Sequence, residues 1–107
     1  MIQDILEALR RIEEYRQGVT YEAFLRDTKL QDAIVRNLGI IGEAVKNLSP
    51  AFKKQHNMIE WKKIAGLRDR VIHHYFGVNW DIVWDVVVNK VPEMRTQFQA
   101  FVPKNSS

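Results

Sequence analysis

The chain has 107 residues, contains no cysteine and carries a formal net charge of +3. This length suits one domain with one hydrophobic core, and it leaves no room for a separate catalytic module. The lack of cysteine excludes disulfides, thiolate catalysis and zinc sites built from cysteine, which suits a cytoplasmic protein.

The charge is unevenly distributed along the chain. Residues 1–50 hold seven Lys or Arg against eight Asp or Glu, whereas residues 51–107 hold nine against five, so the positive excess lies in the second half. A mild basic bias is compatible with RNA or with an acidic protein partner. No apolar run approaches the length of a membrane span, and the first residues lack the pattern of a signal peptide, so we expect no membrane partner.

Hydrophobic periodicity predicts helices throughout the first half of the chain. Apolar residues spaced by three and four predict an amphipathic helix over residues 2–16, which Gly18 ends. Thr20 is the expected N-cap of a short second helix. A longer amphipathic helix is expected to begin at residue 27 or 28 and to end near residue 48.

Two glycines, Gly39 and Gly42, lie inside the predicted long helix. Glycine weakens a helix interior, so two glycines one turn apart indicate that another helix packs closely there. A phosphate-binding loop is not indicated, because no Gly-Lys-Ser/Thr sequence follows.

The middle of the chain is predicted to hold short helical pieces. Ser49 and Pro50 fit the N-cap and first position of a short turn, and His56 is then expected to be a solvated loop residue. A helix is expected to run from residue 66 to about residue 76, where Gly77 stops it.

The last predicted helix begins after Asn79 and continues almost to the C-terminus. Pro92 has no N–H for the carbonyl of Val88, so a bend is expected there. No strand pair is predicted. The chain is therefore expected to be all-α, a small antiparallel helical bundle in one domain over residues 1–102, followed by a polar tail over residues 103–107.

The segment over residues 66–76 gathers side chains with useful chemistry. Arginine holds phosphate with a planar, permanently charged group, and histidine exchanges protons near neutral pH. An arginine and a histidine suffice for metal-free cleavage of RNA. A base takes a proton from the 2′-hydroxyl, and that oxygen attacks the adjacent phosphate. The cation stabilises the negative charge that develops on the phosphate. The candidates are Arg68, Arg70, His73, His74 and Tyr75.

A continuous helix would not aim these side chains at one point. At about 100° per residue, Arg68 and Tyr75 share a face, whereas His73 lies roughly 140° away from Arg68. Asp69 precedes His73 by one turn and is a candidate for orienting it or raising its pKa. Either the helix distorts here, or a second copy of the chain completes the site.

The same residues also have purely structural interpretations. Arg68 can simply pair with Asp69 or another carboxylate, and His73 can be a hydrogen-bonded interface residue. Tyr75 can be a core aromatic whose hydroxyl reaches the surface.

The neighbouring basic residues are expected to play lesser parts. Arg70 is a candidate contact to RNA phosphate or a solvated charge, and His74 has at most a supporting role. A metal is not expected, because zinc needs three or four converging ligands and His73 and His74 would diverge by about 100° on a helix.

The pattern Arg68-x-x-x-x-His73-x-Tyr75 resembles the motif of HEPN-domain ribonucleases, and more closely that of HepT-type toxins. The flanks over residues 36–44 and 75–84 are also similar, and the resemblance covers nearly the whole chain. It implies a HEPN-like homodimer or higher homo-oligomer whose motifs face a shared cleft. Arg68 and His73 would be the catalytic residues of a metal-independent endoribonuclease toxin that uses no cofactor.

The resemblance also implies an antitoxin partner, a small MntA-type nucleotidyltransferase that adds AMP to the motif tyrosine, here Tyr75. Anionic AMP beside Arg68 would block the RNA phosphate by charge and volume. The alternative is a non-catalytic substrate-binding subunit of a two-component nucleotidyltransferase. Such a subunit needs a dimer and a basic cleft but no titrating histidine at position 73, so the intact motif favours the ribonuclease.

Overall fold

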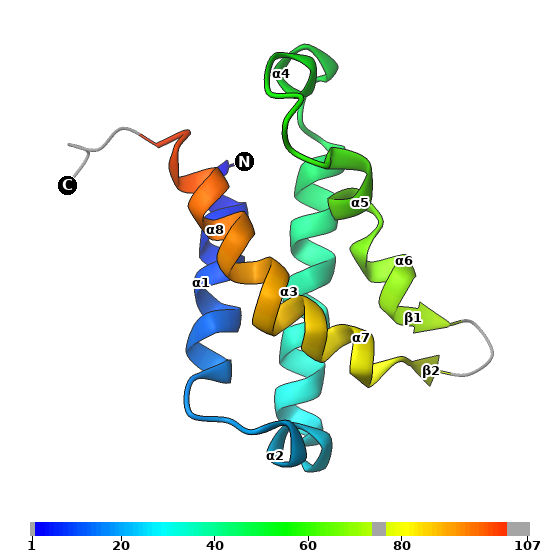
Figure 1. Ribbon diagram of the computed structural model, residues 1–107. Helices are drawn as coiled ribbons and strands as arrows, with labels where there is room; N and C mark the ends of the chain where they lie inside the picture. Colours follow the sequence, from blue (N-terminus) through cyan, green and yellow to red (C-terminus); the bar gives the residue numbers. More distant parts are fainter. Residues whose placement is uncertain (1, 74–76, 103–107) are drawn as a thin grey trace.

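A computed structural model describes residues 2–73 and 77–102, and it confirms the expected all-α class. The long helix α3 runs through the middle of the molecule, with α1 on one side and α5 and α6 on the other (Figure 1). The elements in chain order are α1 (Ile2–Arg16), α2 (Tyr21–Arg26), α3 (Thr28–Lys46), α4 (Pro50–Gln55), α5 (Trp61–Ala65), α6 (Leu67–Val71), β1 (Ile72–His73), β2 (Gly77–Val78), α7 (Trp80–Asp85), η1 (Val86–Lys90) and α8 (Val91–Gln99).

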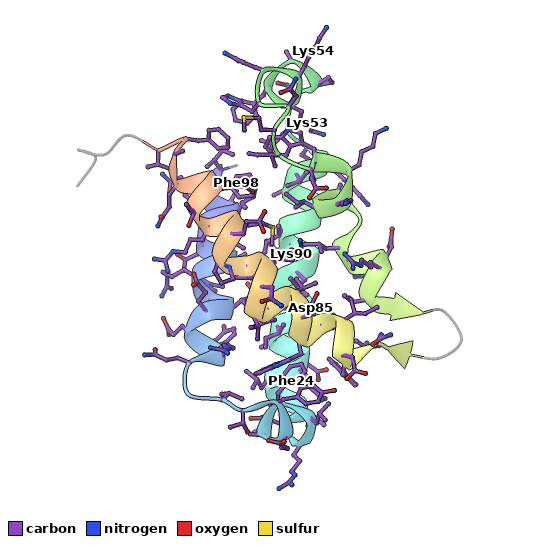
Figure 2. The ribbon with its side chains drawn as sticks, viewed as in Figure 1. Phe24, Lys53, Lys54, Asp85, Lys90 and Phe98 are labelled. Carbon is purple, nitrogen blue, oxygen red and sulfur yellow. The ribbon has the colours of Figure 1, made fainter. Side chains whose placement is uncertain are left out.

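The core lies between α1, α3 and the C-terminal helix. Each contributes the apolar stripe that its periodicity predicted, and burial of such stripes supplies most of the stability of short helices. The largest fully buried side chains are Phe24, Phe98, Ile5, Leu9, Ile12, Ile34, Leu38, Ile41, Val45, Val71, Val83 and Val86. Figure 2 shows Phe24 and Phe98 in different parts of the bundle, so the core extends over most of its length.

Side-chain caps start four of the helices where the sequence predicted a start. Each capping oxygen accepts a hydrogen bond from a backbone N–H in the first turn, which typically stabilises a helix by about 1 kcal/mol. The caps are Thr20 to the N–H of Ala23, Asp27 to Leu30, Ser49 to Phe52, and Asn79 to Ile82. Gly18 ends the first helical region with a φ of 73°, as expected of a helix-terminating glycine.

Gly42 is where α5 packs against α3. A β-carbon at this position would lie 3.1 Å from the carbonyl oxygen of Ala65 and 3.5 Å from that of Ile64. The close helix packing predicted from the glycines is therefore confirmed at Gly42.

The C-terminal helix changes register before its proline. In η1 the N–H of Val91 bonds to the carbonyl of Val86, five residues earlier. Pro92 consequently falls in the first turn of α8, where a missing N–H costs little. The valine-rich run over residues 86–88 is helical rather than extended, as predicted.

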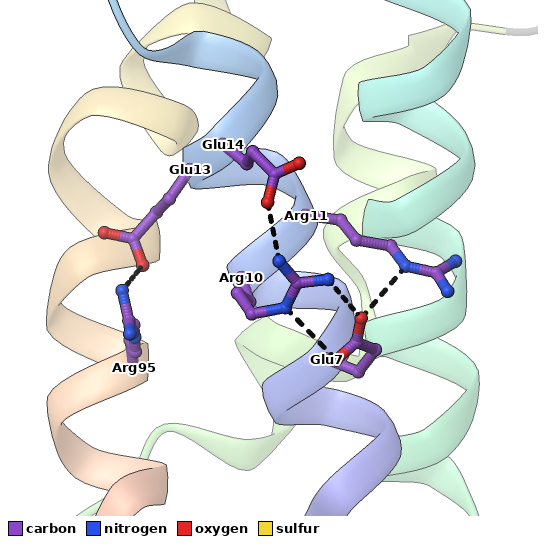
Figure 3. A network of polar contacts seen from close by, with 6 residues as sticks. All are labelled: Glu7, Arg10, Arg11, Glu13, Glu14 and Arg95. Atoms are coloured by element: carbon purple, nitrogen blue, oxygen red, sulfur yellow. Dashed lines mark hydrogen bonds and ion pairs between the residues drawn. The ribbon is translucent and has the colours of Figure 1, made fainter.

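A polar network covers the outer face of α1 (Figure 3). Arg10 bonds to Glu7 and to Glu14, each at 2.6 Å, and the hydrogen bond from Arg10 holds the pKa of Glu7 below its usual range. Arg95 of α8 reaches Glu13 at 2.9 Å and joins the two helices. Exposed pairs of this kind contribute little to stability, because water and salt screen them.

Two predictions about the motif segment were wrong. The expected helix to residue 76 ends at Val71, and an unpredicted antiparallel pair follows, in which Ile72 faces Val78 and His73 faces Gly77. Gly77 does not stop a helix but lies in β2 with a φ of 76°, a conformation that favours glycine. The N–H of Asn79 bonds to the carbonyl of Val71 at 2.8 Å and closes the base of this hairpin.

His56 also departs from its prediction, because it is half-buried rather than solvated. Its ring lies 4.6 Å from that of Phe52 and 4.5 Å from that of Phe101, centre to centre. His56 therefore helps to hold α4 against the end of the C-terminal helix. The polar tail predicted over residues 103–107 lies outside the described residues.

Within the described part of the chain, no helix combines the length and the apolar character needed to cross a bilayer.

Candidate functional site

Arg68 is exposed on α6, and its side chain lies along α3 at Gly39. A β-carbon at position 39 would come within 3.3 Å of the Cδ atom of Arg68 and 3.7 Å of its Nε atom. The close approach expected at this glycine is therefore made by an arginine side chain and not by a helix backbone. Because glycine has no side chain, the guanidinium group can lie flat along the helix.

Arg68 forms part of an open groove of about 580 Å³ between α3 and the start of α7. No local sequence pattern indicates this groove, because its α3 residues meet Arg68, Val78 and Trp80 only in the folded chain. Its other lining residues are Asp32, Val35, Arg36, Gly39, Ile40, Glu43, Val78 and Trp80.

The groove holds two arginines and two carboxylates at its surface. Among the described residues, none of Arg36, Arg68, Asp32 and Glu43 forms an ion pair. The interpretation of Arg68 as a partner of Asp69 is therefore not supported by a contact. An arginine in an open groove without a carboxylate partner is available to a phosphate.

His73 follows Arg68 by five residues, but the chain between them is not one helix. Because α6 ends at Val71, the expected angle of 140° between Arg68 and His73 does not apply, and Asp69 no longer lies one helical turn before His73. The backbone is therefore distorted between Arg68 and His73, and completion of the site by a second copy of the chain stays a prediction.

Two other motif residues, His74 and Tyr75, lie outside the described residues. Arg70 is exposed and lines a different groove of about 300 Å³, together with Lys63, Lys90 and Glu93. The structure thus places Arg70 away from Arg68 and leaves Arg36 of α3 as the second arginine beside Arg68.

The three tryptophans near the motif differ in their surroundings, and one of them lies in the core. Trp61 is only 8% exposed and packs against Phe98 in the core. Trp84 is half-buried, with the guanidinium of Arg16 over its ring at 5.5 Å. Trp80 packs edge-on against Phe24 and lines the groove of Arg68, so it is the tryptophan that this surface presents.

Residues 2–73 and 77–102 contain no cluster of three or more His, Asp or Glu side chains that could hold a metal ion. The groove itself offers the cations of Arg36 and Arg68, and His73 lies in the neighbouring strand β1.

Comparison with known proteins agrees with the motif. Residues 5–101 match the model of the family described as "Ribonuclease HepT-like". The chain is 48% identical over 91 residues to the Methanocaldococcus jannaschii protein named "Putative RNase MJ0127", covering 85% of this chain and 75% of that one. It is 42% identical over 98 residues to the Thermococcus cleftensis protein named "Probable ribonuclease HepT", covering 92% and 89%.

No solved structure matches the chain. The family match spans almost the entire sequence and includes every residue of the Arg68 groove, the motif and the hairpin. The chain belongs to the family of HepT-like ribonucleases.

Proposed function

We propose that this protein is a metal-independent endoribonuclease toxin in which Arg68 binds the scissile phosphate and His73 transfers the proton. The observation that supports this most directly is the placement of Arg68 in an open groove, five residues before His73 and without a carboxylate partner among residues 2–73 and 77–102. The family match and the names of the relatives agree with RNA as the substrate.

The proposed reaction needs only these two side chains. His73 takes the proton of the 2′-hydroxyl, and the 2′-oxygen forms a bond to phosphorus while the bond from phosphorus to the 5′-oxygen breaks. The leaving 5′-oxygen receives a proton from a protonated His73. The 2′,3′-cyclic phosphate remains on the other RNA fragment. Arg68 stabilises the negative charge that builds up on the phosphate oxygens during the attack.

The active form is proposed to be a homodimer in which the exposed face of α3 meets its own copy. If two α3 helices pair antiparallel with the two-fold axis between Gly39 and Ile40, Arg36 of each copy faces Glu43 of the other. These residues are one face of the helix, since positions seven apart differ by only about 20°. Each copy then also brings its Arg68 to the shared cleft, where an RNA phosphate offsets the repulsion between the two cations.

Control of the toxin is proposed to act on Tyr75, two residues after His73. An MntA-type nucleotidyltransferase antitoxin would transfer AMP to the phenol oxygen of Tyr75. The bulky anion would then occupy the cleft beside Arg68 and compete with the RNA phosphate for the same cation.

The reaction is tested by replacing His73 and His74 with alanine, one at a time. His73→Ala should lower the rate of RNA cleavage by about 10²–10⁴-fold, the usual cost of removing a general acid–base group, while the circular dichroism spectrum stays unchanged. His74→Ala is the matched control and should retain most of the activity.

Three results would count against the proposal. Equal cleavage by the two histidine variants would remove His73 from the mechanism, and loss of wild-type cleavage in EDTA would show that a metal is needed. If the protein cuts no RNA under any condition, the non-catalytic binding subunit becomes the better interpretation.

A further inference from the structure

A second groove, separate from that of Arg68, lies at the α4 end of the molecule. It has a volume of about 740 Å³ and is formed where the end of α3, α4 and α5 meet. Figure 2 shows two of its residues, Lys53 and Lys54, on the helix farthest from Phe24. Its lining residues are Lys46, Pro50, Lys53, Lys54, Asn57, Ile59, Glu60, Trp61, Lys62, Lys63 and Ala65.

The groove concentrates the positive charge of the whole protein. Its lining holds five lysines and one glutamate, a balance of +4, while the entire chain carries +3, so the rest of the chain is at −1. Glu60 is already paired with Lys63 at 2.7 Å, and that hydrogen bond lowers the pKa of Glu60. No carboxylate of the described residues pairs with the other four lysines.

Hydrogen bonds and ring contacts hold together the elements that carry the lysines. The indole N–H of Trp61 donates to the carbonyl oxygens of Lys53 and His56, both at 3.0 Å, and so ties α4 to α5. The ring of Phe52 packs on Trp61 and His56, and Gly42 lets α5 lie close to α3. Because these contacts join the three elements, the backbone positions from which the lysines extend are set before any ligand arrives, while the side chains themselves remain flexible.

The lysine groove and the Arg68 groove both include residues of α3. Lys46 and Gly39 are seven residues apart on α3 and so lie within about 20° of each other around the helix. Lys62 on α5 precedes Arg68 on α6 by six residues, and these two helices follow one another along α3. Glu43, which lines the Arg68 groove, lies one turn before Lys46 on α3, and it is the residue proposed above to pair with Arg36 of a second copy.

We infer that this lysine groove binds the phosphate backbone of the RNA outside the cleavage point and holds the strand so that it leads to Arg68. The inference deepens the proposed ribonuclease function and rests on it for the identity of the ligand. Lysine ammonium groups act as point charges that bind phosphate without reading the bases. The groove therefore contributes affinity and salt dependence but no sequence preference.

The experiment measures binding of a probe that the proposed chemistry cannot cut. A fluorescein-labelled 2′-O-methyl oligoribonucleotide of mixed sequence lacks the attacking hydroxyl, so its anisotropy reports binding to the full-length protein alone. The groove variant is Lys54→Gln with Lys62→Gln, two exposed side chains on different helices. The matched control is Arg26→Gln with Lys29→Gln, which removes the same charge at the opposite, α2 end.

The groove variant should bind the probe about tenfold more weakly than the wild type at about 0.1 M salt. Its plot of log Kd against log salt should be shallower by about 1.4, because each lost single-strand phosphate contact removes roughly 0.7. The control variant should match the wild type in both. Equal effects of the two variants would mean that only net charge matters, and would overturn the inference.

Poly-glutamate serves as the second probe. If it binds to the groove more tightly than the oligoribonucleotide, the groove fits an acidic protein segment and the inference fails. Failure of the proposed catalysis would look different. If the protein cuts no RNA but binds the probe through Lys54 and Lys62, the proposed reaction is wrong and the inferred binding groove stands. If the groove variant changes neither cleavage nor the Kd of the probe, the inferred groove is wrong and the proposed reaction stands.

Discussion

Arg68 lies against Gly39, with its Cδ atom 3.3 Å from the point that a β-carbon at position 39 would occupy. The two residues are 29 positions apart in sequence. The glycine thus leaves room for the one side chain proposed to hold the phosphate, and any larger residue there must displace it.

Gly39→Ala should lower the rate of RNA cleavage without lowering the free energy of unfolding. The methyl group requires the Arg68 side chain to shift by a few tenths of an ångström. The rate of RNA cleavage should therefore fall, but by less than the about 100-fold that a misplacement of about 1 Å can cost. The free energy of unfolding should stay the same or rise by up to about 1 kcal/mol, because alanine is a better helix former than glycine. Cleavage assays and urea titrations measure the two effects, and an unchanged cleavage rate would contradict the proposed role of this contact.

Gly42→Ala is the matched comparison, one turn further along α3. Its β-carbon would lie 3.1 Å from the backbone carbonyl oxygen of Ala65, which cannot swing away as a side chain can. The substitution should therefore lower the free energy of unfolding by about 1–3 kcal/mol. A stability equal to that of Gly39→Ala would show that α5 moves away from α3 without cost.

Charge reversal on α3 tests the proposed dimer. Arg36→Glu would place like charges against Glu43 of the second copy, and the protein should become monomeric in light scattering at micromolar concentration. Combining it with Glu43→Arg restores opposite charges and should restore the dimer. Arg26→Glu, exposed on α2, is the control and should leave the mass unchanged. A wild type that is monomeric at every concentration would remove the dimer from the proposal.

Tyr75→Phe tests the proposed control by the antitoxin. The variant keeps the aromatic ring and loses only the hydroxyl, so it should cleave RNA like the wild type but accept no AMP. Intact-mass spectrometry after incubation with a nucleotidyltransferase partner, ATP and a divalent metal should show an added AMP on the wild type alone. An equal mass gain on the variant would move the acceptor to another residue.

Stability should fall as the pH is lowered below the usual glutamate range. Hydrogen bonds from Arg10 and from Lys63 hold the pKa values of Glu7 and Glu60 below the ordinary glutamate value in the folded protein. Their contribution is thus fully present above that value and is lost as the pH falls through the folded-state pKa values. Urea titrations from about pH 6 to pH 3 should show a shallow decline that Glu7→Gln reduces and high salt weakens, since both carboxylates are exposed. A decline of the same slope in Glu7→Gln would exclude this ion pair as a source.

The sequence by itself determined the helical class, the extent of α1 and the starts of α2, α3, α4 and α7. These features depend on residues three or four positions apart: an apolar stripe, or a capping oxygen and the N–H of the first turn that it meets. The pattern of Arg68, His73 and Tyr75 also indicated the family without any structure, because the spacing itself is the signal.

Only the tertiary structure decided where Arg68 lies and where the helix that carries it ends. Helix α6 ends at Val71 because the next residues pair with Gly77 and Val78 across a hairpin, a contact that helical periodicity does not describe. Gly39 lies against the side chain of Arg68, although the two residues are 29 positions apart in the chain. Charge, exposure and reach at such places depend on neighbours distant in the chain, and so no local pattern encodes them.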